Sequence, residues 1–435
     1  MNKNSSSGLI RALGLGALII YGVGDILGAG IYALVGKIAG HAGSLTWLSF
    51  AIAMGIISLT ALSYSELGSR FPKSGGVSIY IHEAFGTQWF SILTGLLLFC
   101  ATVLSMSTLS HAFAGYLRAL GFNIPRSLDV FGFLLILLLI NLRGIKQSST
   151  ANIISTSVEV SGLVLVLGCG FWYLTTHHSN FITTPAETPE IGDVLQGTAL
   201  AFFAFTGFED MANIAEEVKE PQKNLPRAIL SSLGIAGILY LGVSWIATTI
   251  IPGSELSSSE APLLDVVSKS APALPKSLFS IIAIFAVSNS ALLNYITASR
   301  LLYGMSKENL LPKSLQRVHA KFHTPYSAIF LIFPIVLCLV LMSNLGDLAS
   351  STSAIVLIVF SLSNLALIKI KLNTKKEKIS TKIFRIPLLV PCLAIGLNLA
   401  AISFLPLHNI IPAAVLIVIC GFITWGIMKS LLSKN

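Results

Sequence analysis

Long apolar segments separated by short polar links dominate the pattern along the chain. Runs long enough to cross a hydrocarbon layer of about 30 Å occur twelve times. Because a helix satisfies its own backbone polar groups in lipid, this pattern predicts an all-α integral membrane protein with twelve transmembrane helices. The approximate centres of the predicted spans are Leu27, Gly55, Thr102, Leu135, Leu163, Phe203, Tyr240, Phe285, Ile332, Val356, Leu393 and Ile417.

The first span contains an unusual stretch from Gly22 to Ile31, in which glycines are interspersed among apolar residues and Asp25 lies at mid-depth. Lipid offers no hydrogen bonds to a free backbone group or a carboxylate, so this stretch must face protein or a watery cavity. One interpretation is that the helix unwinds from Gly28 to Gly30, which leaves carbonyls for a cation and N–H groups for an anion. The other is that the glycines only allow neighbouring helices to pack closely.

A second interruption falls in the sixth span, where Gly207 is followed by Glu209 and Asp210. It comes five spans after the first, and an odd number of spans reverses the direction of the chain. Two broken helices in corresponding positions are what an inverted repeat of five spans predicts. This pairing favours a substrate site at the break in the first span.

The repeat divides the chain into four parts. We expect a cytoplasmic N-terminal tail at residues 1–12, five-helix repeats at 13–175 and 191–370, and two further helices at 383–431.

Glu159 lies about two turns inside the fifth span. A charged side chain at this depth costs several kcal/mol unless it is paired or wetted, so an ionisable residue here is a functional candidate. We interpret Glu159 as a possible proton carrier; the alternative is a hydrogen-bonded packing residue.

Two further sets of polar residues have a structural explanation. Glu66 and Arg70 have helical spacing at the end of the second span and predict an interfacial ion pair. In the eighth span, Asn289 and Asn294, with two nearby serines, either line a cavity or form hydrogen bonds between helices.

Composition excludes a soluble protein, because 54% of the residues are hydrophobic and only 11% are charged. The formal charge of +9 is distributed by side: with both termini in the cytoplasm, most lysines and arginines fall on the inner face. This asymmetry favours membrane orientation over a nucleic-acid partner. The lysines from Lys371 to Lys382 are better explained as an orienting loop than as a lipid site. The five cysteines show no metal-ligand spacing.

Several segments, taken together and in order, resemble the amino acid-polyamine-organocation superfamily of permeases, nearest the bacterial amino acid permeases related to cationic amino acid transporters. They cover nearly the whole chain and are Gly28-Ala29-Gly30-Ile31, the proline- and glycine-rich link after Glu66, Asn141-Leu142-Arg143-Gly144-Ile145-Lys146, Phe203-Ala204-Phe205-Thr206-Gly207-Phe208-Glu209, Glu216-Glu217-Val218-Lys219-Glu220-Pro221, Ser299-Arg300-Leu301-Leu302-Tyr303-Gly304-Met305-Ser306-Lys307 and Leu311-Pro312-Lys313.

The resemblance implies the five-plus-five inverted-repeat (LeuT-like) fold with broken helices 1 and 6 and alternating access. It implies that the substrate carboxylate meets N–H groups of Ala29, Gly30 and Ile31. It also implies that the α-ammonium meets carbonyls of Ile26, Phe203 and Thr206. Phe203 would also form an aromatic lid, and Glu209 would take part in proton or substrate coupling.

Two residues depart from the pattern of the superfamily. Some members carry a lysine at the position of Glu159, where it replaces a sodium ion, and a glutamate reverses that charge. Asp25 stands where many relatives have a small neutral or polar residue. If its side chain reaches the cavity, it favours cationic substrates such as arginine, lysine, ornithine or a polyamine.

Two short patterns resemble elements of a different class of protein, the intramembrane aspartyl proteases. They are the G-x-G-D pattern of Gly22 to Asp25 and the triplet Pro272 to Leu274. This chain lacks the partner Tyr-Asp motif, and the triplet lies in an outer loop. Two membrane aspartates sharing a proton are therefore not indicated. A transport-inactive amino acid sensor on the same fold would carry a long cytoplasmic tail, whereas both tails here are short.

The sequence thus predicts a secondary active amino acid transporter of the cytoplasmic membrane and not an enzyme. Asp25, Glu159 and Glu209 are its candidates for coupling or charge selectivity. Proton coupling is favoured because no nucleotide-binding motif is present; exchange of one amino acid for another, or for a polyamine, is the alternative. We expect an amino acid, protons and membrane lipid as partners, and no nucleic acid, cofactor or metal.

Overall fold

The computed structural model describes residues 11, 13–73, 75–143, 149–176, 189–319, 322, 324–373 and 383–432. The predicted N-terminal tail, the motif residues Gly144 to Lys146 and the lysines between 374 and 382 lie wholly or almost wholly outside these ranges. The first half of the described chain forms α1 (Leu15–Ala42), η1 (Gly43–Leu45), α2 (Thr46–Arg70), α3 (Gly76–Phe85), α4 (Gln88–Ala119), α5 (Arg126–Leu142) and α6 (Ser149–Thr176).

The second half begins with an interrupted helix and continues with long apolar helices. Its elements are α7 (Ile191–Ala201), η2 (Phe202–Phe205), η3 (Phe208–Ala212), η4 (Ala215–Glu217), α8 (Pro221–Ile250), α9 (Gly253–Ser258), α10 (Pro262–Ser270), α11 (Lys276–Lys307), η5 (Lys313–Gln316), α12 (Tyr326–Met342), α13 (Leu345–Asn373), α14 (Leu389–Ser403) and α15 (Leu407–Leu432). Apart from one isolated bridge between Leu13 and Val218, the regular structure in the described ranges is helical.

The helices have the length and composition of membrane spans. Eight helical stretches in the described residues are long and apolar enough to cross a membrane, and the first, Leu15–Arg70, runs through both α1 and α2. Tyr326–Met342 and Leu389–Ser403 are shorter apolar helices. An all-helical, multi-pass membrane protein is therefore confirmed, whereas the number twelve and the inverted repeat stay predictions.

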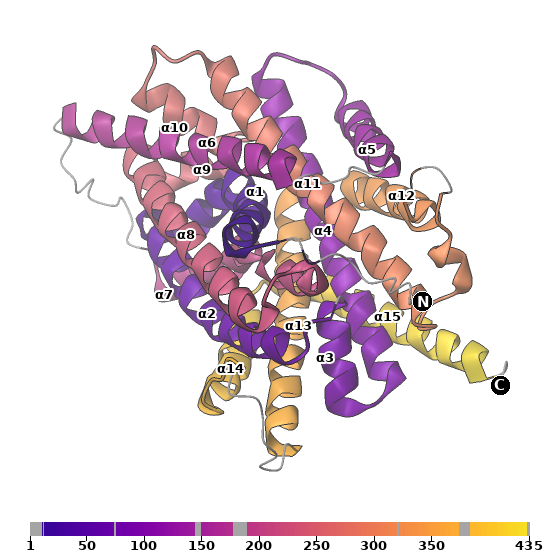
Figure 1. The fold of residues 1–435 in the computed structure, drawn as a ribbon. Helices are drawn as coiled ribbons and strands as arrows, with labels where there is room; N and C mark the ends of the chain where they lie inside the picture. Colours follow the sequence, from indigo (N-terminus) through magenta and orange to yellow (C-terminus); the bar gives the residue numbers. More distant parts are fainter. Residues whose placement is uncertain are drawn as a thin grey trace.

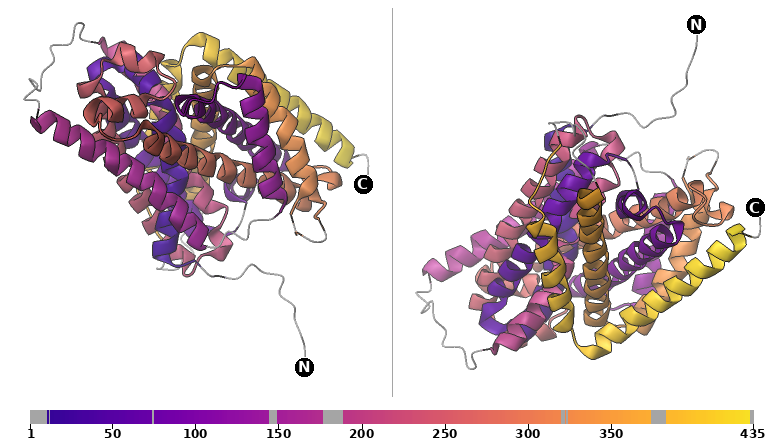
Figure 2. Two further views of the ribbon diagram at one scale, coloured as in Figure 1. Left: turned by 90° about the horizontal axis from the view of Figure 1, so that it is seen from above. Right: turned by 90° about the horizontal axis from the view of Figure 1, so that it is seen from below.

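α1 lies inside the bundle, and the last two helices lie at its outside (Figures 1 and 2). In α1 the described side chains from Gly22 to Gly36 are buried. α15 instead exposes large apolar side chains, with Phe422 70% and Trp425 61% exposed. A row of exposed apolar residues on an outer helix is typical of a surface that faces lipid.

The predicted break in the first helix is wrong, because α1 is a continuous α-helix from Leu15 to Ala42. Its glycines serve close packing instead. A methyl group added at Gly24 would overlap Oγ1 of Thr156 in α6, and one added at Gly30 would overlap the backbone of Ala204 in η2. At these two positions α6 and η2 approach α1 so closely that a side chain larger than hydrogen does not fit.

The predicted break in the sixth span is confirmed. α7 ends at Ala201 and a short 3-10 turn follows, after which Thr206 is extended with ψ 153°. Gly207 then has φ +117°, a conformation that side chains of L-residues rarely adopt. The chain resumes as η3 rather than as an α-helix, so backbone groups around residues 206 and 207 are not part of a regular helix.

Candidate functional site

The break in the sixth span borders a small cavity lined by residues of the bundle interior. Its volume of about 20 Å³ holds about one water molecule. An amino acid would therefore require neighbouring helices to move apart. The lining comes from α1 (Asp25), α4 (Leu98, Ala101, Thr102, Ser105), the break and η3 (Thr206, Gly207, Glu209, Asp210), α11 (Asn294) and α13 (Thr352, Val356).

Three buried carboxylates surround this cavity. The exposed fractions are 6% for Asp25 and 7% for both Glu209 and Asp210. No lysine or arginine is among the described residues that line it. Charges this close repel one another strongly in a medium of low dielectric constant, so the group needs positive charge from protons or from a bound cation.

Local hydrogen bonds fix the two acidic residues of the break. The backbone N–H of Gly207 donates to Oε2 of Glu209 at 2.9 Å, and Nδ2 of Asn213 donates to Oδ1 of Asp210 at 3.1 Å. Oδ2 of Asp25 is buried and has no hydrogen-bond partner among the described residues. Asp25 is therefore the carboxylate of the three that most clearly has a free acceptor atom.

The close approach of α1 to the break depends on Gly207. A Cβ atom at this position would lie 2.9 Å from both the carbonyl carbon and the carbonyl oxygen of Asp25. Such a distance is not tolerated between a side chain and the backbone. Glycine is thus required here both for its positive φ and for contact with α1.

The residues of α4 and α11 that line the cavity carry hydroxyl and amide groups. Nδ2 of Asn294 in α11 donates to Oγ of Ser105 in α4 at 3.0 Å. Asn294 therefore does both things considered for it, lining the cavity and bonding to another helix. Thr102 and Ser105 were not predicted, although their spacing of three residues puts them on one face of an apolar helix.

Tyr240 in α8 connects the two central elements and was also not predicted as a site residue. Its hydroxyl group lies 2.6 Å from the carbonyl oxygen of Ile26 and 3.0 Å from that of Ala204. The ring packs against Phe50 and Phe205, with centroid distances of 5.7 and 5.2 Å. Tyr240 thereby holds α1 against η2 beside the cavity.

Glu159 is fully buried but does not line the cavity. Nδ2 of Asn289 in α11 donates to its Oε1 at 2.8 Å, while its Oε2 has no partner among the described residues. The hydroxyl of Tyr32 in α1 donates to its backbone carbonyl at 2.8 Å. Glu159 therefore lies where α6, α1 and α11 meet.

The remaining predicted substrate ligands are packed rather than open. The N–H groups of residues 29 to 31 belong to the continuous helix α1, whose interior N–H groups bond to carbonyls four residues earlier. The carbonyl of Phe203 accepts from Oγ1 of Thr206 at 2.8 Å, and the Phe203 ring is buried outside the cavity lining. Of the predicted residues, the cavity brings together Asp25, Thr206 and Glu209.

This arrangement of a broken helix, a small cavity lined by polar groups at the break and a lipid-facing exterior is that of a membrane transporter. The family model described as amino acid permease matches residues 13–430. The chain therefore belongs to this family, within the amino acid-polyamine-organocation superfamily, as its motifs indicated.

Characterised relatives have several substrates. The chain is 29% identical to the branched-chain amino acid permease BcaP of Bacillus subtilis (strain 168), over 87% of this chain and 84% of that protein. It is 32% identical to the chloroplastic cationic amino acid transporter 9 of Arabidopsis thaliana, over 73% of this chain and 59% of that protein. It is 28% identical to the methylthioribose transporter of B. subtilis (strain 168), over 93% and 90% respectively.

Proposed function

We propose that the protein is a proton-coupled secondary transporter of amino acids in the cytoplasmic membrane, working by alternating access with both termini in the cytoplasm. Amino acid transport is supported by the permease family. The observation that carries the rest is the small cavity at the helix break, lined by three carboxylates and no basic residue among the described ones. Such a site attracts positive charge, whether it comes as protons or as substrate.

The substrate that this cavity suits best is an amino acid with a cationic side chain. Asp25, Glu209 and Asp210 supply acceptors for ammonium or guanidinium groups, while the hydroxyl of Ser105 and the amide of Asn294 supply donors for a carboxylate. The lining therefore combines acceptor and donor groups, as a zwitterion with an additional positive charge requires.

Asp25 provides the test of substrate charge. Asp25→Asn keeps the volume of the side chain but removes its charge, so arginine uptake should fall by tenfold or more, as roughly expected for loss of a buried charged hydrogen bond, while alanine uptake should fall less. Competition between the two labelled substrates measures the change directly. Equal loss for both would contradict a cationic substrate.

We assign coupling to Glu159, which is fully buried where α6, α1 and α11 meet and accepts a hydrogen bond from Asn289 at 2.8 Å. Glu159→Gln should abolish uptake driven by a pH gradient and leave counterflow exchange partly intact, because the amide cannot carry a proton. Glu255→Gln, at an exposed position in α9, is the matched control and should behave as the unmodified protein. Retention of gradient-driven uptake in Glu159→Gln would remove this role.

The decisive experiment is uptake of labelled arginine, alanine and leucine by the purified protein in liposomes, with and without an inward proton gradient. Accumulation that follows the gradient in otherwise empty vesicles is the expected result. Uptake only into vesicles preloaded with amino acid or polyamine would instead establish an exchanger.

A further inference from the structure

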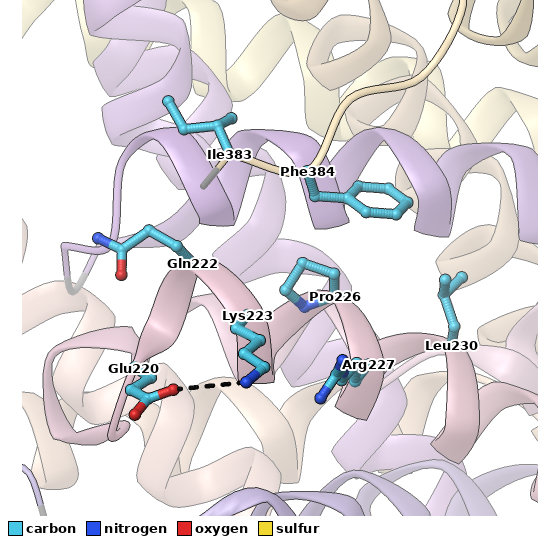
Figure 3. Close-up of a pocket in the computed structure, with 8 residues that line it drawn as sticks. All are labelled: Glu220, Gln222, Lys223, Pro226, Arg227, Leu230, Ile383 and Phe384. Atoms are coloured by element: carbon cyan, nitrogen blue, oxygen red, sulfur yellow. Dashed lines mark ion pairs between the residues drawn. The ribbon is translucent and has the colours of Figure 1, made fainter. Parts of the chain in front are cut away.

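A second, larger cavity lies away from the helix break, where the first turns of α8 face the segment that leads into α14. Its volume is about 750 Å³. Figure 3 shows Ile383 and Phe384 across this space from the side chains of α8. The lining residues are Glu220, Gln222, Lys223, Pro226, Arg227, Leu230, Ile383 and Phe384.

The α8 wall of this cavity has a basic part and an apolar part. Lys223 and Arg227 are exposed and one helical turn apart, so both charges point to the same side. Nζ of Lys223 is 4.0 Å from a carboxylate oxygen of Glu220, a distance at the limit for an ion pair. Arg227 has no ion-pair partner among the described residues, so its charge is free to meet a ligand.

The opposite wall is held in place by buried and partly buried hydrogen bonds. The backbone N–H of Phe384 donates to Oγ of Ser69 at 3.0 Å, and that hydroxyl donates to the carbonyl of Gln222 at 3.1 Å. Two residues later, the N–H of Ile386 donates to Oε2 of fully buried Glu66 at 2.9 Å. These hydrogen bonds fix residues 384 and 386 against α2 and α8, so this wall of the cavity has a defined position.

Glu66 strengthens this wall through two basic residues. Its Oε1 lies 2.6 Å from Nη2 of Arg70, as the spacing of these residues predicted, and its Oε2 lies 2.7 Å from Nζ of Lys371 in α13. Losing one partner of such a buried ion pair is strongly destabilising, so α2, α13 and the segment at residue 386 are held together.

The same face of α8 leads from the charges to an apolar surface. Ile238 follows Arg227 by eleven residues, three helical turns, and therefore lies on the same face about 16 Å further along the axis. Its side chain is 70% exposed. Leu389 at the start of α14 is likewise 65% exposed. Basic groups at one end and exposed apolar side chains beyond them match the headgroup and acyl chains of a phospholipid.

We propose that this cavity binds one anionic glycerophospholipid, with its phosphate between Lys223 and Arg227 and an acyl chain along Leu230 and the outer face of α8. Free phosphate would use only the basic end. A soluble acidic partner would leave the apolar face beyond Arg227 uncovered, so a lipid accounts for both parts of the surface.

The test is native mass spectrometry of delipidated full-length protein titrated with phosphatidylglycerol, with phosphatidylcholine as the neutral lipid. We expect one saturable phosphatidylglycerol site. The double substitution Lys223→Gln, Arg227→Gln should weaken it roughly 10- to 30-fold, the effect of about two basic contacts at an anionic lipid. Glu220→Gln should change the affinity in the opposite direction, because it removes the competing carboxylate.

The control is Lys313→Gln, Arg317→Gln, which removes two exposed charges with the same spacing in and after η5. It should leave the phosphatidylglycerol affinity unchanged. Equal weakening by both double variants would overturn the site in favour of general charge attraction. Displacement of the lipid by millimolar inorganic phosphate would show a free-anion site instead. Circular dichroism verifies folding, and Glu220→Gln tests the site independently if the double variant unfolds.

Discussion

Close packing of the glycines in α1 can be tested at Gly24, which faces Thr156 in α6. A methyl group at position 24 would overlap Oγ1 of Thr156 and lie 3.2 Å from its Cβ and 3.4 Å from its Cγ2. Overpacking of this kind costs about 1–3 kcal/mol. We therefore expect Gly24→Ala to lower the free energy of unfolding by about that amount.

Thr156→Ala supplies the compensating change. It removes both Oγ1 and Cγ2 and leaves only the Cβ contact at 3.2 Å, which a shift of a few tenths of an ångström relieves. Alone, it costs about 1 kcal/mol for the lost methyl group, because its hydrogen bond to the carbonyl of Ile20 is long, at 3.4 Å. The double variant should therefore be less destabilised than the sum of the single variants by about 1–2 kcal/mol.

The assay is unfolding by sodium dodecyl sulfate in mixed micelles, followed by circular dichroism. Gly55→Ala in α2 is the control, since a methyl group there has nothing within 4 Å, and it should be neutral or slightly stabilising. A cost below about 0.5 kcal/mol for Gly24→Ala, within the range of a substitution that touches nothing, would refute the packing. Strictly additive costs would also refute it.

Three further changes test the site. Gly207→Ala should abolish uptake in liposomes, because alanine rarely adopts φ +117°; Gly304→Ala, which adds a methyl group in open space, should not. Tyr240→Phe removes the buried O–H that is shared between the carbonyls of Ile26 and Ala204 and should lower the free energy of unfolding by about 1–3 kcal/mol, measured in the same mixed micelles; an unchanged value would contradict the contact. Asn289→Ala should impair pH-driven uptake as Glu159→Gln does, and normal pH dependence would separate the two residues.

The sequence predicted the break at Gly207 and failed at the glycines of α1 for a physical reason. Glycine both permits unusual backbone angles and permits close contact, and the choice depends on neighbours distant in the chain. At Gly24 and Gly30 those neighbours are Thr156 and Ala204. At Gly207 the prediction of a break did not depend on distant neighbours, because the nearby carboxylates of Glu209 and Asp210 already disfavour an ordinary apolar helix.

The sequence indicated some of the residues that line the cavity at the helix break and not others. Asp25 and Glu209 were conspicuous because carboxylates are rare inside membrane spans. Thr102 and Ser105 gave no such signal, because hydroxyl groups in apolar helices commonly bond to a carbonyl one turn earlier, as Thr102 does to Leu98 at 2.9 Å. Asn289 became meaningful only when folding brought it to Glu159.

The hydroxyl of Tyr240 has a mechanical consequence. Its one O–H is shared between a carbonyl of α1 and a carbonyl of η2, so in the proposed alternating-access cycle we expect α1, η2 and α8 to move together. Separating them would leave two carbonyls without this partner in a dry interior, which is costly. We therefore expect the movement of the proposed transport cycle to occur between these elements and α4: spin labels on α1 and α8 should keep their spacing while the distance from α1 to α4 changes.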